Sequence, residues 1–278
     1  MSAHAVDRVA VKNAAAGSVG PHGSPRRYFH SLWLLSSRDL KVKYATNWLG
    51  YLWSILEPLA MGLIYWFVFT QIFPRGIGED PYIIYLMAGL LPWTWFTHAV
   101  NDGTAALTKD KKLVRSTGIP NTIWVCRVAM TTGISFLLSL PMLLAFLLVY
   151  HGEVTLTWGL LWFPVAMLLQ LTLVLGLGLM LSVLCVLISD LSRTTSLVLR
   201  MMFYASPILY SPQRLPESVS WVEVVNPMFG ILSLYRVGFF PDLWNTQAVI
   251  ASALISFGVL ALGASTFRML IRPVLKDL

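Results

Sequence analysis

The stretch WGLLWFPVAMLLQLTLVLGLGLMLSVLCVLI, residues 158–188, contains no acidic or basic side chain over 31 positions. About 20 apolar residues in a helix are enough to cross the hydrocarbon core of a bilayer. Inside lipid, a helix also satisfies its own backbone hydrogen bonds. The length and composition of this stretch therefore predict a membrane-spanning helix.

Four more segments of this kind flank it, at residues 48–73, 82–100, 124–150 and 248–267, and the first of them contains one carboxylate, Glu57. The whole chain is 56% hydrophobic and 12% charged, whereas a soluble domain carries about a quarter of charged residues. The fold class predicted is an all-α polytopic membrane protein.

A sixth, weaker segment at residues 194–210 contains both Arg200 and Pro207. If it crosses as well, both termini lie on one side, and that side carries 17 of the 20 lysines and arginines. Membrane proteins keep basic residues in the cytoplasm, so the sequence predicts six transmembrane helices with both termini cytoplasmic. This asymmetry also accounts for the net charge of +7 without a nucleic-acid partner.

Residues 1–25 are small and polar, are punctuated by Pro and Gly, and include no apolar stretch typical of a signal peptide. We predict a disordered cytoplasmic tail over 1–25 and one membrane domain over 26–278.

Residues 25–44, PRRYFHSLWLLSSRDLKVKY, place Phe29 and Trp33 on one helical face and basic side chains opposite. This pattern is typical of an amphipathic helix lying in the membrane interface. A simple anchor and a contact with a cytoplasmic partner both remain open. The residues singled out in this predicted interface helix are Arg27, Leu32, Trp33, Arg38, Lys41 and Lys43.

The loop TKDKKLVRSTGIPN, residues 108–121, contains a short helical stretch that ends at Gly118 and Pro120. Its composition fits an ordinary basic cytoplasmic loop and a docking element equally well.

Glu57 is costly in lipid, so it is expected to face protein or a water-filled path. It shares a helical face with Trp53, Met61 and Tyr65, and both a structural pairing and a role in translocation are open. One turn apart, His98 and Asp102 predict a polar cluster rather than a metal site.

Residues 211–247 are too apolar for a solvated loop and are broken by Pro216 and Pro227. They predict short re-entrant helices between spans five and six, packed on protein or lining a cavity.

Phosphate-loop, H-E-x-x-H and G-x-S-x-G motifs are missing from the sequence, so neither an ATPase site nor a cofactor is expected in this chain. Three functions follow: transport powered by another chain, a membrane-embedded glycosyl- or acyltransferase, or proton-coupled transport through Glu57. The last class usually shows inverted repeats, which we do not find.

The order of these features resembles the permease subunits of type-2 ABC exporters, in the branch that exports O-antigen, capsule, teichoic acid or galactan. The resemblance covers about residues 26–240 and is carried by RDLKVKYATNWLGYLWSILEPL, YLMAGLLPWTWF, KKLVRSTGIPNTIW, ISDLSRT, YASPILYSP and NPMFGILSLYR.

The resemblance implies a homodimer in the bacterial cytoplasmic (inner) membrane, bound to two copies of a cytoplasmic ATPase that holds ATP and Mg. The substrate implied is a lipid-linked polysaccharide, and the outer helices implied are Pro216–Glu223 and Met228–Phe240. The coupling helix to the ATPase would comprise Lys109, Asp110, Lys111, Lys112, Leu113, Val114, Arg115 and Gly118. The channel lining would comprise Trp53, Glu57, Met61, Tyr65, Arg200 and Tyr204, and the outer gate Trp221, Asn226, Pro227, Tyr235 and Arg236.

Overall fold

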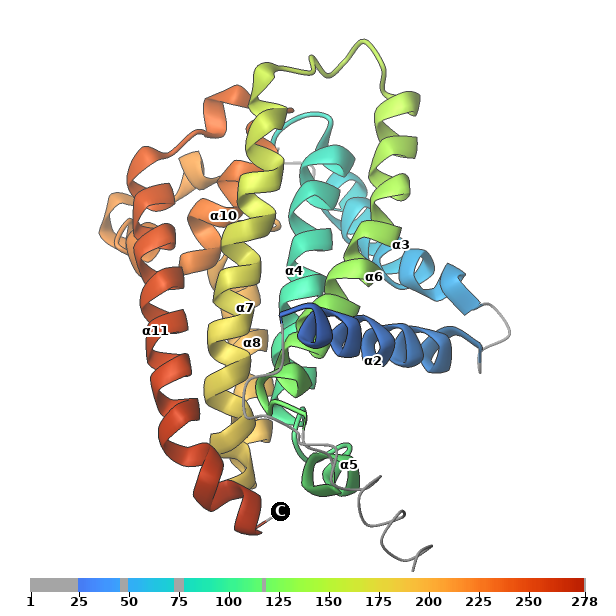
Figure 1. Cartoon of the computed structure of the whole chain (residues 1–278). Coiled ribbons are helices and arrows are strands. Elements are labelled where there is room, and N and C mark those ends of the chain that lie inside the picture. Colours follow the sequence, from blue (N-terminus) through green and yellow to red (C-terminus); the bar gives the residue numbers. More distant parts are fainter. Residues whose placement is uncertain (1–24, 46–49, 73–77, 117–118, 278) are drawn as a thin grey trace, which may run out of the picture.

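The chain folds as a helical bundle in a computed structural model that describes residues 25–45, 50–72, 78–116 and 119–277 (Figure 1). The tail predicted for residues 1–25 lies almost entirely outside the described residues, and so does Gly118 of the predicted coupling helix.

Within the described residues, five helices are long and apolar enough to cross a membrane, which confirms the five stronger predicted spans. They are α3 (Trp53–Phe67, within a helical segment Gly50–Ile72), α4 (Tyr82–Thr104), α6 (Thr122–Val149), α7 (Trp162–Leu187, preceded by η3 at Trp158–Leu161) and α11 (Thr246–Asp277).

The sixth predicted segment forms α8, Leu191–Ala205. Its 15 residues rise about 22 Å, less than the roughly 30 Å of a hydrocarbon core. The chain continues beyond the helix through the irregular residues 206–211. Six spans therefore remain a prediction.

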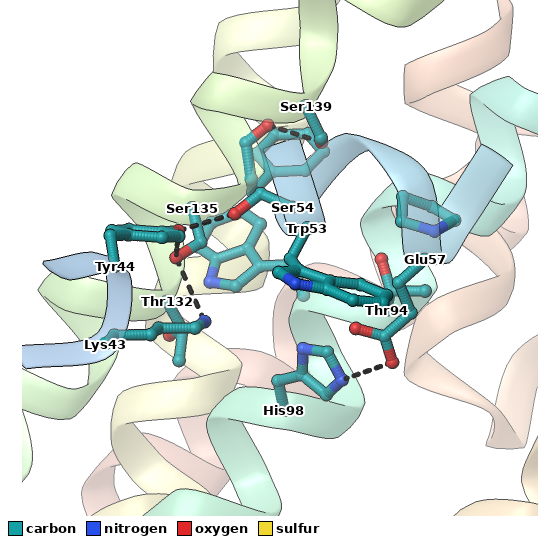
Figure 2. A pocket seen from close by; sticks show the side chains of 13 residues that line it. Lys43, Tyr44, Trp53, Ser54, Glu57, Thr94, His98, Thr132, Ser135 and Ser139 are labelled. Atoms are coloured by element: carbon teal, nitrogen blue, oxygen red, sulfur yellow. Dashed lines mark hydrogen bonds and ion pairs between the residues drawn. The ribbon is translucent and has the colours of Figure 1, made fainter. Parts of the chain in front are cut away.

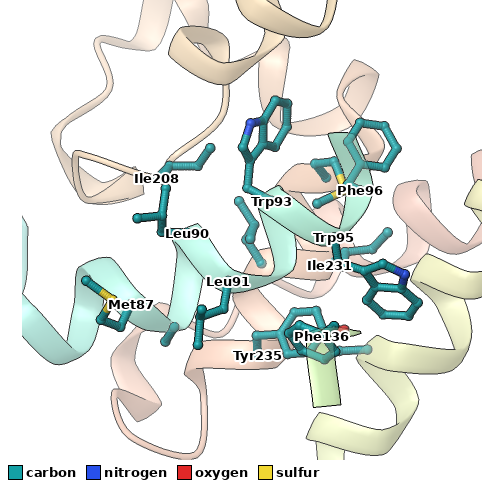
Figure 3. Close-up of a cluster of buried hydrophobic side chains, with 14 of the residues drawn as sticks. Met87, Leu90, Leu91, Trp93, Trp95, Phe96, Phe136, Ile208, Ile231 and Tyr235 are labelled. Carbon is teal, nitrogen blue, oxygen red and sulfur yellow. The ribbon is translucent and has the colours of Figure 1, made fainter. Parts of the chain in front are cut away.

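Helix α4 is the centre of the bundle, because 83% of its most apolar window is buried, against 11% for α3. It packs on α3, α6, α7, α8 and α10. A helix that is apolar all round is expected to be buried in this way. Figure 3 shows part of the resulting core, in which Trp95 of α4 lies near Phe136 of α6, and Phe136 lies near Tyr235 of α10. Trp93 and Phe96 point to the other side of α4 (Figure 3).

Helices α7 and α11 pack closely along their length (Figure 1). Their backbones approach at two glycines, since a Cβ on Gly176 would lie 2.6 Å from the Leu260 nitrogen and one on Gly263 would overlap the Gly176 carbonyl. Small residues at such crossings are how membrane helices gain contact area.

Helix α2 (Pro25–Ala45) lies across the bundle rather than along it (Figure 1). Phe29 and Trp33 are 67% and 57% exposed, as expected for an interface helix whose apolar side faces lipid.

Helix α5 (Lys111–Ser116) lies at the same end of the bundle as the C-terminal end of α11 (Figure 1), an end that we call the α5 end. The coupling helix predicted to start at Lys109 starts at Lys111 instead. Lys109 and Asp110 belong to the preceding turns, and the Asp110 carbonyl accepts the first helical hydrogen bonds, from the Leu113 and Val114 nitrogens.

The apolar loop between α8 and α11 does contain short helices. They are η4 (Pro212–Arg214), η5 (Glu217–Val219), α9 (Val222–Val225), α10 (Pro227–Arg236) and η6 (Pro241–Leu243). Met228–Arg236 of α10 are all buried, so this part of the loop packs on protein. That these helices dip into the outer leaflet stays a prediction.

Candidate functional site

The α5 end carries a small basic surface, which we call the α5 surface. Lys109, Lys111, Lys112 and Arg115 are all exposed there. Val114 is only 4% exposed and packs with Trp124, Phe267 and Val274 in a second apolar core. Helix α5 is therefore attached through Val114, with Leu113 packed against the same core, and shows its charged side to solvent.

Asp110 faces the protein instead of joining this surface. Its carboxylate accepts hydrogen bonds from Arg127 of α6 and, at 3.4 Å, from Arg38 of α2. Arg127 also lies 3.4 Å, Nε to Oδ2, from Asp39 of α2, and its guanidinium sits over the Trp124 ring. Arg127 is 1% exposed, whereas the side chains of Asp110 and Arg38 are 19% and 46% exposed. The four charges therefore form a network around one buried cation, and this network joins α2, the turn before α5, and α6.

The network shifts the acidity of Asp110. Burial alone would raise the pKa of its carboxyl, but the hydrogen bond and charge of Arg127, assisted by Arg38, outweigh burial and hold the pKa below the ordinary 3.8. Asp110 is therefore an anion at neutral pH.

A second contact fixes the start of α2. The Tyr28 hydroxyl lies 3.2 Å from Thr122 Oγ1 and donates to Cys126 Sγ at 3.3 Å, both on α6. Burial and this thiol raise the pKa of Tyr28 to about 12. Of the predicted interface residues, Arg38 joins the charge network, Lys43 donates to Ser135 of α6, and Leu32 is half-buried. Arg27, Trp33 and Lys41 are exposed.

The predicted channel residues do not enclose a path within one chain. Trp53, Met61 and Tyr204 are 50%, 44% and 69% exposed, and Arg200 is exposed as well. Only Tyr65 meets the other helix, since its ring stacks on Phe203 of α8 with centroids 5.9 Å apart. These residues form an open face on α3 and α8, which we call the α3/α8 face.

Glu57 pairs with a residue that the sequence did not suggest. Its Oε1 lies 3.8 Å from His98 Nε2, and the two side chains are 61% and 47% exposed (Figure 2). Helix α3 packs on α4 and places Glu57 opposite His98, while the polar cluster of His98 with Asp102, one turn apart on α4, stays a prediction.

The predicted gate residues divide into two groups. Trp221 is 61% exposed, whereas Asn226 and Tyr235 are buried. Pro227 is half-buried at the first turn of α10, whose first free N–H, that of Met228, donates to Asn226 Oδ1 at 3.0 Å. The Asn226 amide donates to Ser206 Oγ at 2.8 Å and so ties α10 to the end of α8.

Arg236 anchors the same region from the other end of α10. It is 1% exposed. It donates to the carbonyls of Tyr85, Pro207 and Ile208 and to the Tyr85 hydroxyl, over whose ring the guanidinium lies. Gly89 on α4 leaves room for it, because a Cβ there would overlap Arg236 Nη2. One buried cation thus holds α4, α10 and residues 206–211 together.

A family model described as ABC-2 type transporter matches residues 30–240. The chain belongs to the ABC-2 transporter family. It is 30% identical over 243 residues to the O-antigen export system permease protein RfbA of Klebsiella pneumoniae, covering 87% of this chain and 92% of that protein. It is 31% identical over 236 residues to RfbA of Myxococcus xanthus, covering 84% and 89%. Identity to the polysialic acid transport protein KpsM of Escherichia coli is 24% over 212 residues, covering 73% and 79%.

Membership of this family and the five apolar helices make the chain a multi-pass inner-membrane protein.

Two residues important in this ABC-2 chain, Asp39 and Arg127, were not predicted from the sequence. The available signal was a single acidic residue in each of two basic stretches, RDLK at 38–41 and KDKK at 109–112. A lone carboxylate among cations is expected to have a partner nearby.

Proposed function

We propose that this chain is the permease subunit of an exporter for a lipid-linked polysaccharide, powered by ATP hydrolysis in a separate cytoplasmic ATPase. The likeness to permeases named for O-antigen and polysialic acid covers most of the chain and most of each relative, and supports this substrate class.

The observation that carries the proposal is the α5 surface. Its four exposed cations lie at one end of the bundle, while Val114 and Asp110 attach it to the core. A motor that docks there would push on α5, and through Asp110 and Arg127 it would reach α2 and α6 directly. We propose that this surface seats in the ATPase, with ATP and Mg held by that partner.

The α3/α8 face supports the second part of the proposal, a homodimer with two ATPase subunits. A lone chain leaves Trp53, Glu57, Met61, Arg200 and Tyr204 open. A second copy placed against this face would turn it into the wall of a closed path, with aromatic side chains on which sugar rings can stack. In this arrangement α8 with residues 206–211 completes a sixth span, both termini are cytoplasmic, and α10 lies at the outer end as a gate.

The test is complementation in a host that lacks the chromosomal copy. Wild type should restore surface polysaccharide, whereas the triple variant Lys111→Glu/Lys112→Glu/Arg115→Glu should leave the polysaccharide inside the cell and should lose the ATPase on co-purification. Arg193→Glu, a charge reversal of an exposed arginine outside α5, is the matched control. Normal surface polysaccharide in the deletion strain would refute the transport role, and full export by the triple variant would refute the docking role.

Two further measurements separate the alternatives. Export that stops when the proton gradient is collapsed at constant ATP would favour a secondary transporter using Glu57. Sugar or acyl transfer by the purified chain alone would favour a transferase.

A further inference from the structure

A partly enclosed pocket of about 80 Å³ opens between the end of α2 and helices α3, α4 and α6 (Figure 2). We call it the α3/α4/α6 pocket. Lys43 and Tyr44 come from α2, Trp53, Ser54, Glu57 and Pro58 from α3, Thr94, Trp95 and His98 from α4, and Thr132, Ser135, Phe136 and Ser139 from α6. Nine of these thirteen residues carry a hydroxyl, a carboxylate, an amine or an imidazole, which is unusual for a cavity among membrane helices.

One residue of the lining, Trp95, carries a buried donor without a hydrogen-bond partner. Trp95 is 4% exposed, and its indole N–H has no hydrogen-bond partner. A buried donor without a partner costs free energy, so a bound group that accepts this hydrogen bond would be favoured. The ring itself is held in place by stacking on Phe136, with centroids 4.9 Å apart.

The hydroxyls of the pocket present mainly acceptors. Thr94, Thr132 and Ser139 donate their protons to carbonyls of their own helices, at 2.8, 2.8 and 2.7 Å. Their lone pairs therefore remain available to a ligand. At one end, Tyr44 joins Ser54 and Ser135 at 2.6 and 2.8 Å; at the mouth, Glu57 adds a carboxylate beside His98 (Figure 2).

A ligand for this lining must both donate and accept hydrogen bonds. A phosphate offers mainly acceptors, so although Lys43 would attract it, it would also meet the Glu57 carboxylate and several hydroxyl lone pairs. A sugar unit offers O–H groups that do both, and the half-exposed Trp53 ring supplies an apolar surface for its C–H face.

We propose that the α3/α4/α6 pocket binds one sugar unit of the transported glycan, with Trp95 Nε1 as a donor and the hydroxyls of Thr94, Thr132 and Ser139 as acceptors. The proposal rests on the proposed function and makes it more specific. It places the glycan next to the junction of α2 with α3, so that displacement of α2 by the motor would act on the bound sugar.

The test uses the full complex in its host, with the photo-crosslinking residue p-benzoylphenylalanine at position 139 in the pocket. Irradiation should give an adduct that stains for carbohydrate after periodate oxidation. The matched control carries the same residue at position 254 on α11, where Leu254 is 70% exposed, and should give no carbohydrate adduct. A phospholipid adduct at position 139, identified by its mass and phosphorus, would overturn the proposal, and so would the absence of any adduct.

A second variant pair tests the assigned donor. Trp95→Phe removes the N–H and keeps a ring against Phe136. The yield of the carbohydrate adduct at position 139 should therefore fall about fivefold, which corresponds to the loss of one hydrogen bond. Trp162→Phe, on α7 away from the pocket, should leave the yield unchanged. Equal yields in both would overturn the role of Trp95. Surface glycan measured in the deletion strain distinguishes failure of the pocket proposal from failure of the proposed function. If export depends on the chain but position 139 gives no carbohydrate adduct, only the pocket proposal is refuted.

Discussion

Two buried arginines show how single residues connect the helices of this permease. Arg127 links α2 and the turn before α5 to α6, and Arg236 links α4 and residues 206–211 to α10. A guanidinium presents five donors in a planar fork, so one side chain can satisfy carbonyls or carboxylates from several elements. Both arginines are 1% exposed, and removing Arg236 would leave buried carbonyls without their donor.

We expect Arg236→Leu to lower the free energy of unfolding by about 3–5 kcal/mol, as for loss of one partner of a buried charged group. Arg236→Lys should not rescue it, because one ammonium cannot reach the carbonyls of Tyr85, Pro207 and Ile208 together. Thermal unfolding in detergent measures this, with Arg193→Leu on exposed α8 surface as the control. Equal melting temperatures for the two leucine variants would contradict the role assigned to Arg236.

The charge network also predicts a pH dependence. The folded-state pKa of Asp110 is depressed, so its contribution to stability is present above the ordinary Asp pKa and is lost as pH falls through the lower folded value. The melting temperature of the wild type should therefore fall more between pH 6 and pH 3 than that of Asp110→Asn. Asp102→Asn, at an exposed position on α4, should follow the wild type. If the melting temperatures of all three proteins change with pH in the same way, the ion pair of Asp110 with Arg127 does not contribute to stability.

At the scale of elements, the closest contact is the glycine crossing of α7 and α11. Gly263→Ala should lower the free energy of unfolding by about 1–3 kcal/mol, because the added methyl overlaps the Gly176 carbonyl and forces the helices apart. Gly258→Ala on the same helix is the matched control, since nothing lies within 4 Å of its Cβ position. It should be neutral or slightly stabilising, given the higher helix propensity of Ala. Equal losses for both variants would mean that propensity or lipid contacts, not the crossing, set the cost.

The positions of the membrane-spanning helices could largely be predicted from the sequence, because the length and composition of each apolar segment determine whether it can span. All five strong segments were confirmed, with the predicted 82–100 extending to Thr104 and the predicted 248–267 extending through Arg268 and Arg272 to Asp277. The exact start of α5 could not be read, because it depends on how the chain turns after α4.

Contacts between distant segments could not be predicted in the same way. Asp39 and Arg127 are 88 positions apart, so no local pattern pairs them, although both lie on the side predicted to be cytoplasmic. The i, i+4 spacing of His98 and Asp102 predicted a polar cluster but could not add Glu57 to it, because the pairing of Glu57 with His98 depends on the packing of α3 on α4. Arg236 was singled out through the family resemblance, but its complete burial follows from the fold alone.

At the scale of the whole molecule, α8 decides whether the chain crosses the membrane five or six times. With six crossings, the α5 end and the C-terminal end of α11 both face the cytoplasm, which agrees with their position at one end of the bundle (Figure 1). It also keeps Arg268, Arg272 and Lys276 on the basic side, where the positive-inside rule places them. The alternative would put these three cations outside the cell.

Labelling of single cysteines in intact cells decides between these topologies. In a background where Cys126 and Cys185 are replaced by serine, Lys112→Cys and Lys276→Cys should react with an impermeant maleimide only after the membrane is opened. Glu217→Cys, in the apolar loop between α8 and α11, should react in intact cells, because α8 with residues 206–211 has carried the chain across. A cytoplasmic Glu217→Cys together with an external Lys276→Cys would mean that α8 does not complete a crossing, and the dimeric path proposed for the α3/α8 face would lose one of its two walls.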